Sequence, residues 1–334
     1  MAAPTKSEKP RKGLPYANEN LDSWVERVRS GDPRALARAI SAVEDHRPES
    51  VPLLKALFPH TGKARILGLT GAPGAGKSTL VDQLAREYRK QERSIGIIAV
   101  DPTSPFSGGA ILGDRIRMLA HHGDPGIYIR SMATRGSLGG LARTTSDAAS
   151  VLDASGKDLI LIETVGVGQD EVEIVRLADV TIVMVVPGMG DDVQTIKAGI
   201  MEIADIFVIN KSDREGAERV EREIRAMQSL ATRSDNWTPA IVRTVASAGS
   251  GIRELADAIA EYEEHLGREN LVLKKKAQNW RERLLEMLRD SLLEGVLRRE
   301  LNDGELARYA TDIAEHRRDP YSLVEELTGK LGKS

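Results

Sequence analysis

The 334-residue sequence predicts an α/β fold in which a mostly parallel sheet is flanked by helices, with further helical segments towards both ends of the chain. Continuous runs of β-branched and apolar residues, such as SIGIIAV and VTIVMVV, are typical of strands buried on both faces of a parallel sheet. Segments with helical periodicity lie between these runs and supply the crossovers that parallel strands need. In such sheets ligands gather at the carboxyl ends of the strands, so polar motifs that follow the runs are the first candidates for a functional site.

Seven segments have the composition of these strands. They span residues 65–70, 94–100, 126–131, 158–163, 180–186, 206–210 and 240–245. Their alternation with helical segments is the pattern of a single α/β domain. We therefore expect all seven strands to belong to one sheet.

Composition divides the chain into four regions. Residues 1–20 are polar and contain several prolines, so we expect a mobile tail. Residues 21–60 have the spacing of short amphipathic helices and form an N-terminal extension. The α/β domain then covers residues 61–266, and residues 267–334 form a charged helical arm.

The C-terminal helical arm carries an apolar stripe at three- and four-residue spacing, formed by Leu285, Leu288, Leu292 and Val296. Such a stripe must be covered. From the spacing alone, the α/β domain and a second subunit are equally good candidates.

The charge and composition exclude several classes of function. The chain has 47 basic and 50 acidic side chains, so its field does not suit nucleic acid, and we expect no nucleic-acid partner. No apolar run approaches the ~20 residues that span a bilayer, and the first residues lack the apolar stretch of a secretion signal. With no cysteine, disulfides and thiolate metal sites are absent. We therefore expect a cytoplasmic protein with no membrane partner.

The most informative motif is GAPGAGKS at residues 71–78, a complete GxxxxGK[ST] pattern between an apolar strand and a helix. Its glycines let successive backbone N–H groups point at phosphates, and the following helix adds its positive N-terminal dipole. Lys77 is expected to reach the β- and γ-phosphates, and the Ser78 hydroxyl to bind Mg²⁺. The motif therefore predicts binding of a nucleoside triphosphate with Mg²⁺.

A second motif, NKSD at residues 210–213, indicates that the base is guanine. The Asp213 carboxylate can accept hydrogen bonds from the ring N–H and amine of guanine, whereas adenine offers a lone pair at that position. Asn210 is expected to hold the Hoogsteen edge, and the Lys211 stem to cover one face of the purine. After the last strand, two residues are expected to close over the guanine through backbone N–H groups, namely Ser247 and Ala248.

Two acidic residues end strands beside the phosphate loop and complete the expected catalytic set with Lys77. Glu163 ends the strand at 158–163 and is expected to hold Mg²⁺, although Ras-like enzymes have Asp there. Asp101 is expected to bind metal-bound water or to orient the attacking water, and a bare helix-capping role is its alternative. Gly166 allows the backbone to approach the γ-phosphate.

The activation of the attacking water is not evident from the motifs. Gln169 lies three residues after Gly166, whereas the catalytic Gln of Ras-like enzymes follows its Gly directly. We therefore expect slow hydrolysis by the chain alone and acceleration by a partner that orders the switch segments or supplies positive charge.

Four segments together carry a resemblance to a known family: GAPGAGKST, VDPTSPFSGGAILGDRIRM, IETVGVGQDE and VINKSD. They resemble the MeaB/ArgK family of SIMIBI-class P-loop GTPases, the bacterial relatives of the human methylmalonic aciduria type A protein. The resemblance covers roughly residues 20–330. It implies a GTPase chaperone that protects adenosylcobalamin-dependent methylmalonyl-CoA mutase and uses GTP to gate delivery of cofactor from the cobalamin adenosyltransferase. It also implies a homodimer joined through the C-terminal helical arm.

The resemblance also assigns roles to individual positions. The nucleotide contacts that it implies are Gly74, Ala75, Gly76, Lys77, Ser78 and Thr79, with Asn210, Lys211 and Asp213 at the base. The implied metal and switch acids are Asp101, Asp114 and Glu163, and Gly166 and Gln169 belong to the same switch region. The loop at residues 187–197 resembles an additional switch that reports to the client, with three candidate residues: Asp191, Gln194 and Lys197.

Several alternative functions are weighed against this one. The client can be a different acyl-CoA mutase or another metalloenzyme, because the sequence has no readable code for partner choice. A transport-linked ATP kinase conflicts with the guanine motif and with the absence of HRD and DFG motifs. A nickel-delivering GTPase needs a Cys/His cluster, and the sole adjacent pair is His121-His122. The chain has no DxHxxG segment, so we expect GTP or GDP and Mg²⁺ as ligands but no directly bound cobalamin.

Overall fold

The computed structural model describes residues 20–102, 123–134, 140–164, 177–188, 203–230, 233, 235–300 and 303–331. The chain divides into two compact units, Met1–Leu271 and Val272–Ser334. The predicted tail at residues 1–20 lies, except for Asn20, outside the described residues. Within the described ranges, no helix is long and apolar enough to cross a membrane.

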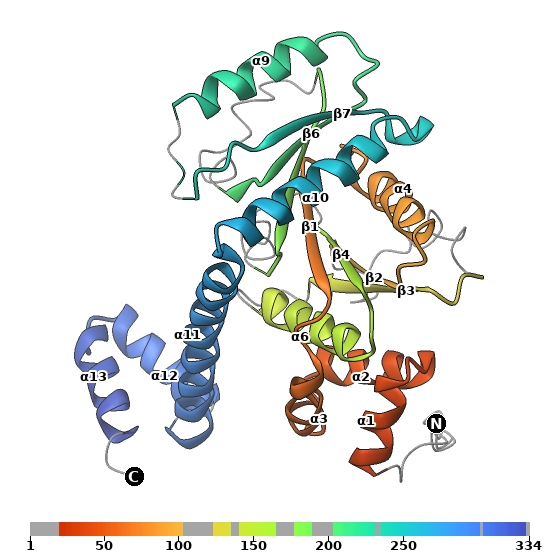
Figure 1. The fold of residues 1–334 in the computed structure, drawn as a ribbon. Helices are drawn as coiled ribbons and strands as arrows, with labels where there is room; N and C mark the ends of the chain where they lie inside the picture. Colours follow the sequence, from red (N-terminus) through yellow and green to blue (C-terminus); the bar gives the residue numbers. More distant parts are fainter. Residues whose placement is uncertain are drawn as a thin grey trace, which may run out of the picture. The chain divides into compact units, whose positions relative to one another are not determined.

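The first unit contains a seven-stranded sheet in the order β3-β2-β4-β1-β5-β6-β7, in which every neighbouring pair is parallel (Figure 1). The strands are β1 (Arg65–Gly71), β2 (Ile95–Pro102), β3 (Ile127–Thr134), β4 (Leu159–Glu163), β5 (Val180–Val185), β6 (Ile206–Asn210) and β7 (Ala240–Thr244). All seven predicted strands and the parallel α/β fold are confirmed. The largest difference is in β3, which runs three residues further because its pairing with β2 continues to Thr134.

The central strands are buried over their whole length, as the continuous apolar runs predict. Every residue of β4, β5 and β6 is buried. At the end of β1, the chain approaches β5 so closely that only glycine fits. Gly71 has φ +144°, and a Cβ there would lie 2.3 Å from the carbonyl oxygen of Met184. This contact brings the carboxyl end of β1 close to the end of β5.

Helices cover both faces of the sheet. The helix α4 (Lys77–Arg89) lies against β1 and β4, and α10 (Ile252–Arg268) contacts α4 and the strands β5, β6 and β7. On the opposite face, α6 (Gly140–Ala154) contacts β2 and β4, and α9 (Ala217–Gln228) contacts β6. One core cluster joins α6 to alternate strand residues, including Ile98, Ile160 and Ile162.

The N-terminal segment forms short helices, as expected from its periodicity: α1 (Leu21–Arg29), α2 (Pro33–Glu44), α3 (Ser50–Leu57) and the 3₁₀ turn η1 (Phe58–His60). Side chains cap the first two, because Asn20 accepts from the Ser23 N–H at 2.8 Å and Asp32 from the Ala35 N–H at 2.9 Å. Trp24 and other apolar residues of these helices share one core with α6 and the sheet.

The second unit is helical and contains α11 (Leu271–Glu300), α12 (Asp303–Ala314) and α13 (Pro320–Leu331). Several large apolar side chains of α11 are exposed in the single chain: Trp280, Leu284, Leu285, Leu288, Leu292 and Leu293. Three members of the predicted stripe are in this set, and the side chain of Val296 lies outside the described part. In α13, Leu323 and Leu327 are buried.

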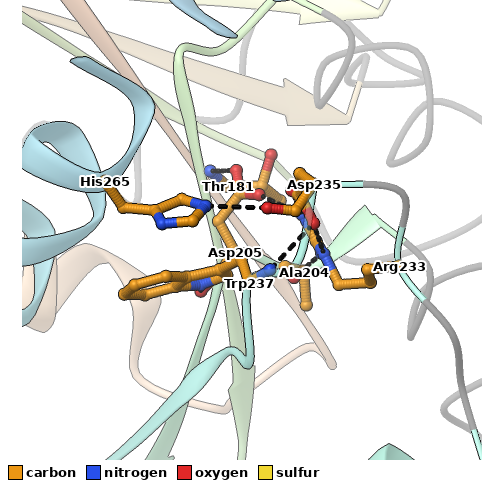
Figure 2. Close-up of polar contacts among 7 residues, drawn as sticks. All are labelled: Thr181, Ala204, Asp205, Arg233, Asp235, Trp237 and His265. Carbon is orange, nitrogen blue, oxygen red and sulfur yellow. Dashed lines mark hydrogen bonds and ion pairs between the residues drawn. The ribbon is translucent and has the colours of Figure 1, made fainter. Parts of the chain in front are cut away.

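A partly buried ionic cluster joins elements at the amino-terminal ends of β5 and β6 (Figure 2). The Arg233 guanidinium donates to the Asp235 carboxylate at 2.6 Å, to Asp205 at 3.0 Å and to the Ala204 carbonyl at 2.7 Å. The indole N–H of Trp237 donates to the Asp205 carbonyl at 2.8 Å. Burial favours the neutral acid at Asp235, but the Arg233 hydrogen bonds lower its pKa below the ordinary value. The cluster lies at the edge of the sheet opposite the predicted nucleotide site.

Candidate nucleotide-binding site

The phosphate-binding motif takes the strand, loop and helix form that the sequence predicts. The strand β1 ends at Gly71, and α4 begins at Lys77. Gly74 and Gly76 have φ +75° and +94°, a region that side chains other than glycine rarely adopt. A Cβ at Gly76 would also lie 2.6 Å from the Asn210 Nδ2 atom. These glycines let the loop curl tightly against the base-reading motif.

Lys77 is the first residue of α4 and is only 6% exposed. Its ammonium donates to the carbonyl oxygens of Gly71 at 2.7 Å and Ala72 at 3.1 Å. Both acceptors belong to the phosphate-binding motif. The positive charge is therefore held where the motif predicts the phosphates.

Ser78 and Glu163 meet although they are 85 residues apart in the chain. The Ser78 hydroxyl donates to Glu163 Oε1 at 2.6 Å, and both residues are buried. Parallel pairing of β4 with β1 and β2 sets this contact, because Glu163 is in register with Leu69 on one side and Ala99 on the other. A hydroxyl and a carboxylate are oxygen ligands of the kind that Mg²⁺ prefers, so this pair fits the metal that the sequence predicts.

The backbone of Asp101 lies near the end of β2, two residues beyond Ala99. Ala99 is in register with Glu163 on the neighbouring strand β4. The backbone thus places both predicted acids at the carboxyl edge of the sheet. The side chain of Asp101 lies outside the described part of the chain.

Asn210 joins the phosphate loop to the strand that precedes the second base loop. It is 2% exposed, and its Nδ2 donates to the Ala75 carbonyl at 2.7 Å. Its Oδ1 accepts from the Thr244 hydroxyl and from the Ala246 N–H, both at 3.0 Å. Next to it, Lys211 donates to the Gly74 carbonyl at 2.8 Å. The two predicted motifs are therefore one connected structure.

The remaining residues that the sequence predicts to read the base lie at the same edge and are exposed. Asp213 follows β6, and the 3₁₀ turn η3 (Ala246–Ala248) follows β7. Within that turn, the Ala248 N–H donates to the Val245 carbonyl at 2.9 Å, while Ser247 is exposed. Of the two amides predicted to close over the base, that of Ala248 already has an acceptor in the protein.

Several predicted residues lie outside the described part of the chain, namely Asp114, Gly166, Gln169, Asp191, Gln194 and Lys197. Thr79 is in the first turn of α4. Motif reading missed three buried hydroxyl groups next to the site, those of Thr70, Thr164 and Thr244. A signal for them exists in the sequence, because each is a polar residue at the end of an apolar strand segment.

Comparison with known proteins identifies the family. A family model described as "Methylmalonyl Co-A mutase-associated GTPase MeaB" matches residues 36–300. The chain belongs to the MeaB family. As a member of this family it is a GTPase, so its nucleotide ligands are GTP and GDP, used with Mg²⁺.

The MeaB-family assignment agrees with individual relatives. A protein of Pyrococcus abyssi whose name describes it as a GTPase is 49% identical over 314 residues, covering 93% of this chain and 97% of the relative. The mitochondrial methylmalonic aciduria type A homolog of Mus musculus is 39% identical over 235 residues, covering 68% of this chain and 56% of that protein. The solved structure of a protein named LAO/AO transport system kinase has a TM-score of 0.69 and 27% identity, and covers 93% of this chain and 97% of that one.

Proposed function

We propose that this MeaB-family GTPase is a chaperone of adenosylcobalamin-dependent methylmalonyl-CoA mutase. In this proposal it protects the mutase from inactivation, and GTP binding and hydrolysis gate the delivery of cofactor from the cobalamin adenosyltransferase, with which it works only indirectly. The description of the family model as mutase-associated and the name of the mouse relative support this client. The structural observation that best supports the GTPase part of the proposal is the set of hydrogen bonds made by Asn210, because they connect the phosphate motif to the base motif.

The described side chains support the proposed binding of phosphate and metal. Lys77 places its charge inside the phosphate loop, and the N-terminus of α4 adds backbone N–H groups. Ser78 and Glu163 are the residues that would hold Mg²⁺, with Asp101 and Asp114 as further proposed acids. When bound, the metal would neutralise charge on the β- and γ-phosphates. The residues themselves bind and orient the triphosphate for attack by water.

Guanine selection follows from the remaining hydrogen-bonding capacity of the base motif. Both lone pairs of the Asn210 Oδ1 are used, so this side chain can serve the base only through a donor hydrogen of Nδ2. The N7 atom on the Hoogsteen edge of guanine accepts such a bond. Asp213 is exposed and acceptor-only, which suits the N–H and amine groups of guanine. Adenine would leave the carboxylate facing a lone pair.

We propose that the chain is a homodimer in which a second copy covers the exposed apolar side chains of α11. Leu284, Leu285, Leu288 and Leu292 recur on the helix and are exposed in the single chain. Sedimentation equilibrium is expected to give about twice the chain mass of 36.4 kDa. A monomer at micromolar concentration would contradict this part of the proposal.

Two alternatives differ from the proposal in client or in nucleotide. A different acyl-CoA mutase or another metalloenzyme would use the same guanine site. A transport-linked ATP kinase is suggested by the name of the protein in the similar solved structure. The NKSD motif at residues 210–213 speaks against ATP, because its carboxylate has no donor to accept from adenine.

The proposal is tested by titrating purified methylmalonyl-CoA mutase into the GTPase by calorimetry, with GDP, with a non-hydrolysable GTP analogue and without nucleotide. Binding is expected, with an affinity that differs between the nucleotide states. Lys77→Ala is the matched control, because it should bind the mutase without responding to the analogue. Absence of binding in every state would contradict this client, and the same titration with other acyl-CoA mutases would then test the alternative.

A further inference from the structure

Three buried threonine hydroxyl groups belong to elements around the metal-site acid, and we call them the hydroxyl cluster: Thr70 of β1, Thr145 of α6 and Thr164, which follows β4. Thr70 and Thr145 are 0% exposed, and Thr164 is 2% exposed. The Thr164 hydroxyl donates to the Thr70 hydroxyl at 3.2 Å, and its N–H donates to the Leu69 carbonyl at 3.1 Å. Thr164 directly follows Glu163, so this bond lies at the point where the chain leaves β4.

Alternation along the strands places Thr70 and Thr164 on the face that α6 covers. The Glu163 side chain points to the other face, where it meets Ser78 at the start of α4. Ile66, Ile160 and Ile162, with the same parity as the two threonines, pack in or against the core cluster that contains α6. Thr70 and Thr164 therefore lie on the same face of the sheet as α6.

Helix geometry places Thr145 at the same level. The Leu152 side chain of α6 packs on β2, because a Cβ at Gly96 would lie 2.8 Å from Leu152 Cδ1. Thr145 precedes Leu152 by two helical turns and lies on the same face of α6. The two residues are about 10.5 Å apart along the helix axis, and α6 runs antiparallel to the strands. Along β2 that distance corresponds to about three residues, so Thr145 lies at the level of Ala99, three residues beyond Gly96. Ala99 is in register with Glu163, so Thr145 lies over the sheet beside the exit from β4.

Within the described part of the chain, the Thr145 hydroxyl has no hydrogen-bond partner although it is fully buried. A buried hydroxyl without a partner costs stability, because its hydration is lost without compensation. Its presence is explained if another state of the protein supplies a partner. A Thr164 side chain can reorient by one rotamer step about χ1, which redirects its hydroxyl away from β1.

We propose that Thr145 is a positioning residue for GTP hydrolysis, whose hydroxyl replaces Thr70 as the partner of Thr164 when GTP is bound. The exchange shifts Thr164 and so adjusts the adjacent Glu163 with respect to the γ-phosphate. It acts through the backbone and does not touch the nucleotide. The proposal concerns the GTPase alone and does not depend on which protein is the client.

The test compares Thr145→Val, which removes the hydroxyl with little change of shape, with Thr145→Ser, which keeps it. For Thr145→Val without nucleotide, Tm is expected to rise by about 2 °C, because a buried unpaired hydroxyl is removed. Its kcat for GTP is expected to fall about tenfold at unchanged KM, as for the loss of one hydrogen bond in the transition state. The extra stabilisation that a GTP analogue gives over GDP is expected to disappear. Thr145→Ser should restore both.

Thr70→Val is the second variant and removes the partner seen in this structure. It should lower the Tm without nucleotide but reduce kcat by less than about twofold, because Thr145 still receives the Thr164 hydroxyl. Wild-type kcat in Thr145→Val would overturn the proposal. Equal losses of kcat in Thr145→Val and Thr70→Val would also overturn it, since the cluster would then be a packing feature only. Thr164→Ser, which keeps its hydroxyl, is the control if either valine variant does not fold.

Discussion

Replacing Asn210 by Ala should weaken both the fold and nucleotide binding, because this side chain connects the phosphate loop to the base loop. It makes three hydrogen bonds, to the Ala75 carbonyl, the Thr244 hydroxyl and the Ala246 N–H. At about 0.5–1.5 kcal/mol each, and with partners left unpaired in a buried site, the expected loss of unfolding free energy is roughly 2–4 kcal/mol. A loop that no longer holds its shape should also bind GDP more than about tenfold more weakly.

Urea denaturation of the nucleotide-free protein measures the free energy of unfolding, and calorimetric titration measures the affinity for GDP. Thr244→Val is the graded control, because it removes only one of the three bonds and should cost about 1 kcal/mol. Asn210→Asp keeps both accepted bonds but loses the donor to Ala75 and buries a carboxylate oxygen against that carbonyl, so its loss of stability should be at least as large as that of Asn210→Ala. A loss below about 1 kcal/mol in Asn210→Ala, with unchanged GDP affinity, would refute the reasoning.

Three further predictions concern the base, the phosphate and the ionic cluster. Asp213→Asn should weaken GTP binding and favour xanthine nucleotides, because the amide can donate to the oxo group that replaces the guanine amine; competition binding that still favours GTP would contradict the base assignment. Lys77→Ala should abolish GTP turnover and leave the circular dichroism spectrum unchanged; loss of the folded spectrum would instead indicate a structural role. Arg233 lowers the Asp235 pKa in the folded state, so the ionised carboxylate stabilises the fold at pH values above its ordinary pKa of 3.8. This stabilisation is lost as the pH falls through the lower pKa of the folded state. Asp235→Asn should therefore cost about 1–3 kcal/mol of unfolding free energy at pH 7 and progressively less as the pH falls below 3.8. An equal cost in chemical denaturation at neutral and at acidic pH would contradict the linkage.

Strands and motifs could be predicted because their signals are local. The apolar runs of β5 and β6 are continuous, and the spacing within residues 71–78 and 210–213 is specific for phosphate and guanine. The extension of β3 to Thr134 could not be predicted, because it depends on pairing with β2 rather than on composition.

Contacts between distant segments were beyond the reach of motif reading. Ser78 meets Glu163 only because the register of β1 and β4 brings two residues 85 positions apart to one edge. Asn210 is predicted as a base reader, but its bond to Ala75 spans 135 positions and depends on the packing of β6 beside the phosphate loop. The ion pair of Arg233 with Asp205 has no motif at all, because an arginine beside an acidic residue is common on protein surfaces.

The most direct test of the central claim is the steady-state rate of GTP hydrolysis, with ATP as the control nucleotide, in the absence and presence of purified methylmalonyl-CoA mutase. The account predicts slow hydrolysis that is specific for GTP and is accelerated by the mutase. Hydrolysis of ATP at a comparable rate, or fast GTP hydrolysis that does not respond to the mutase, would contradict it.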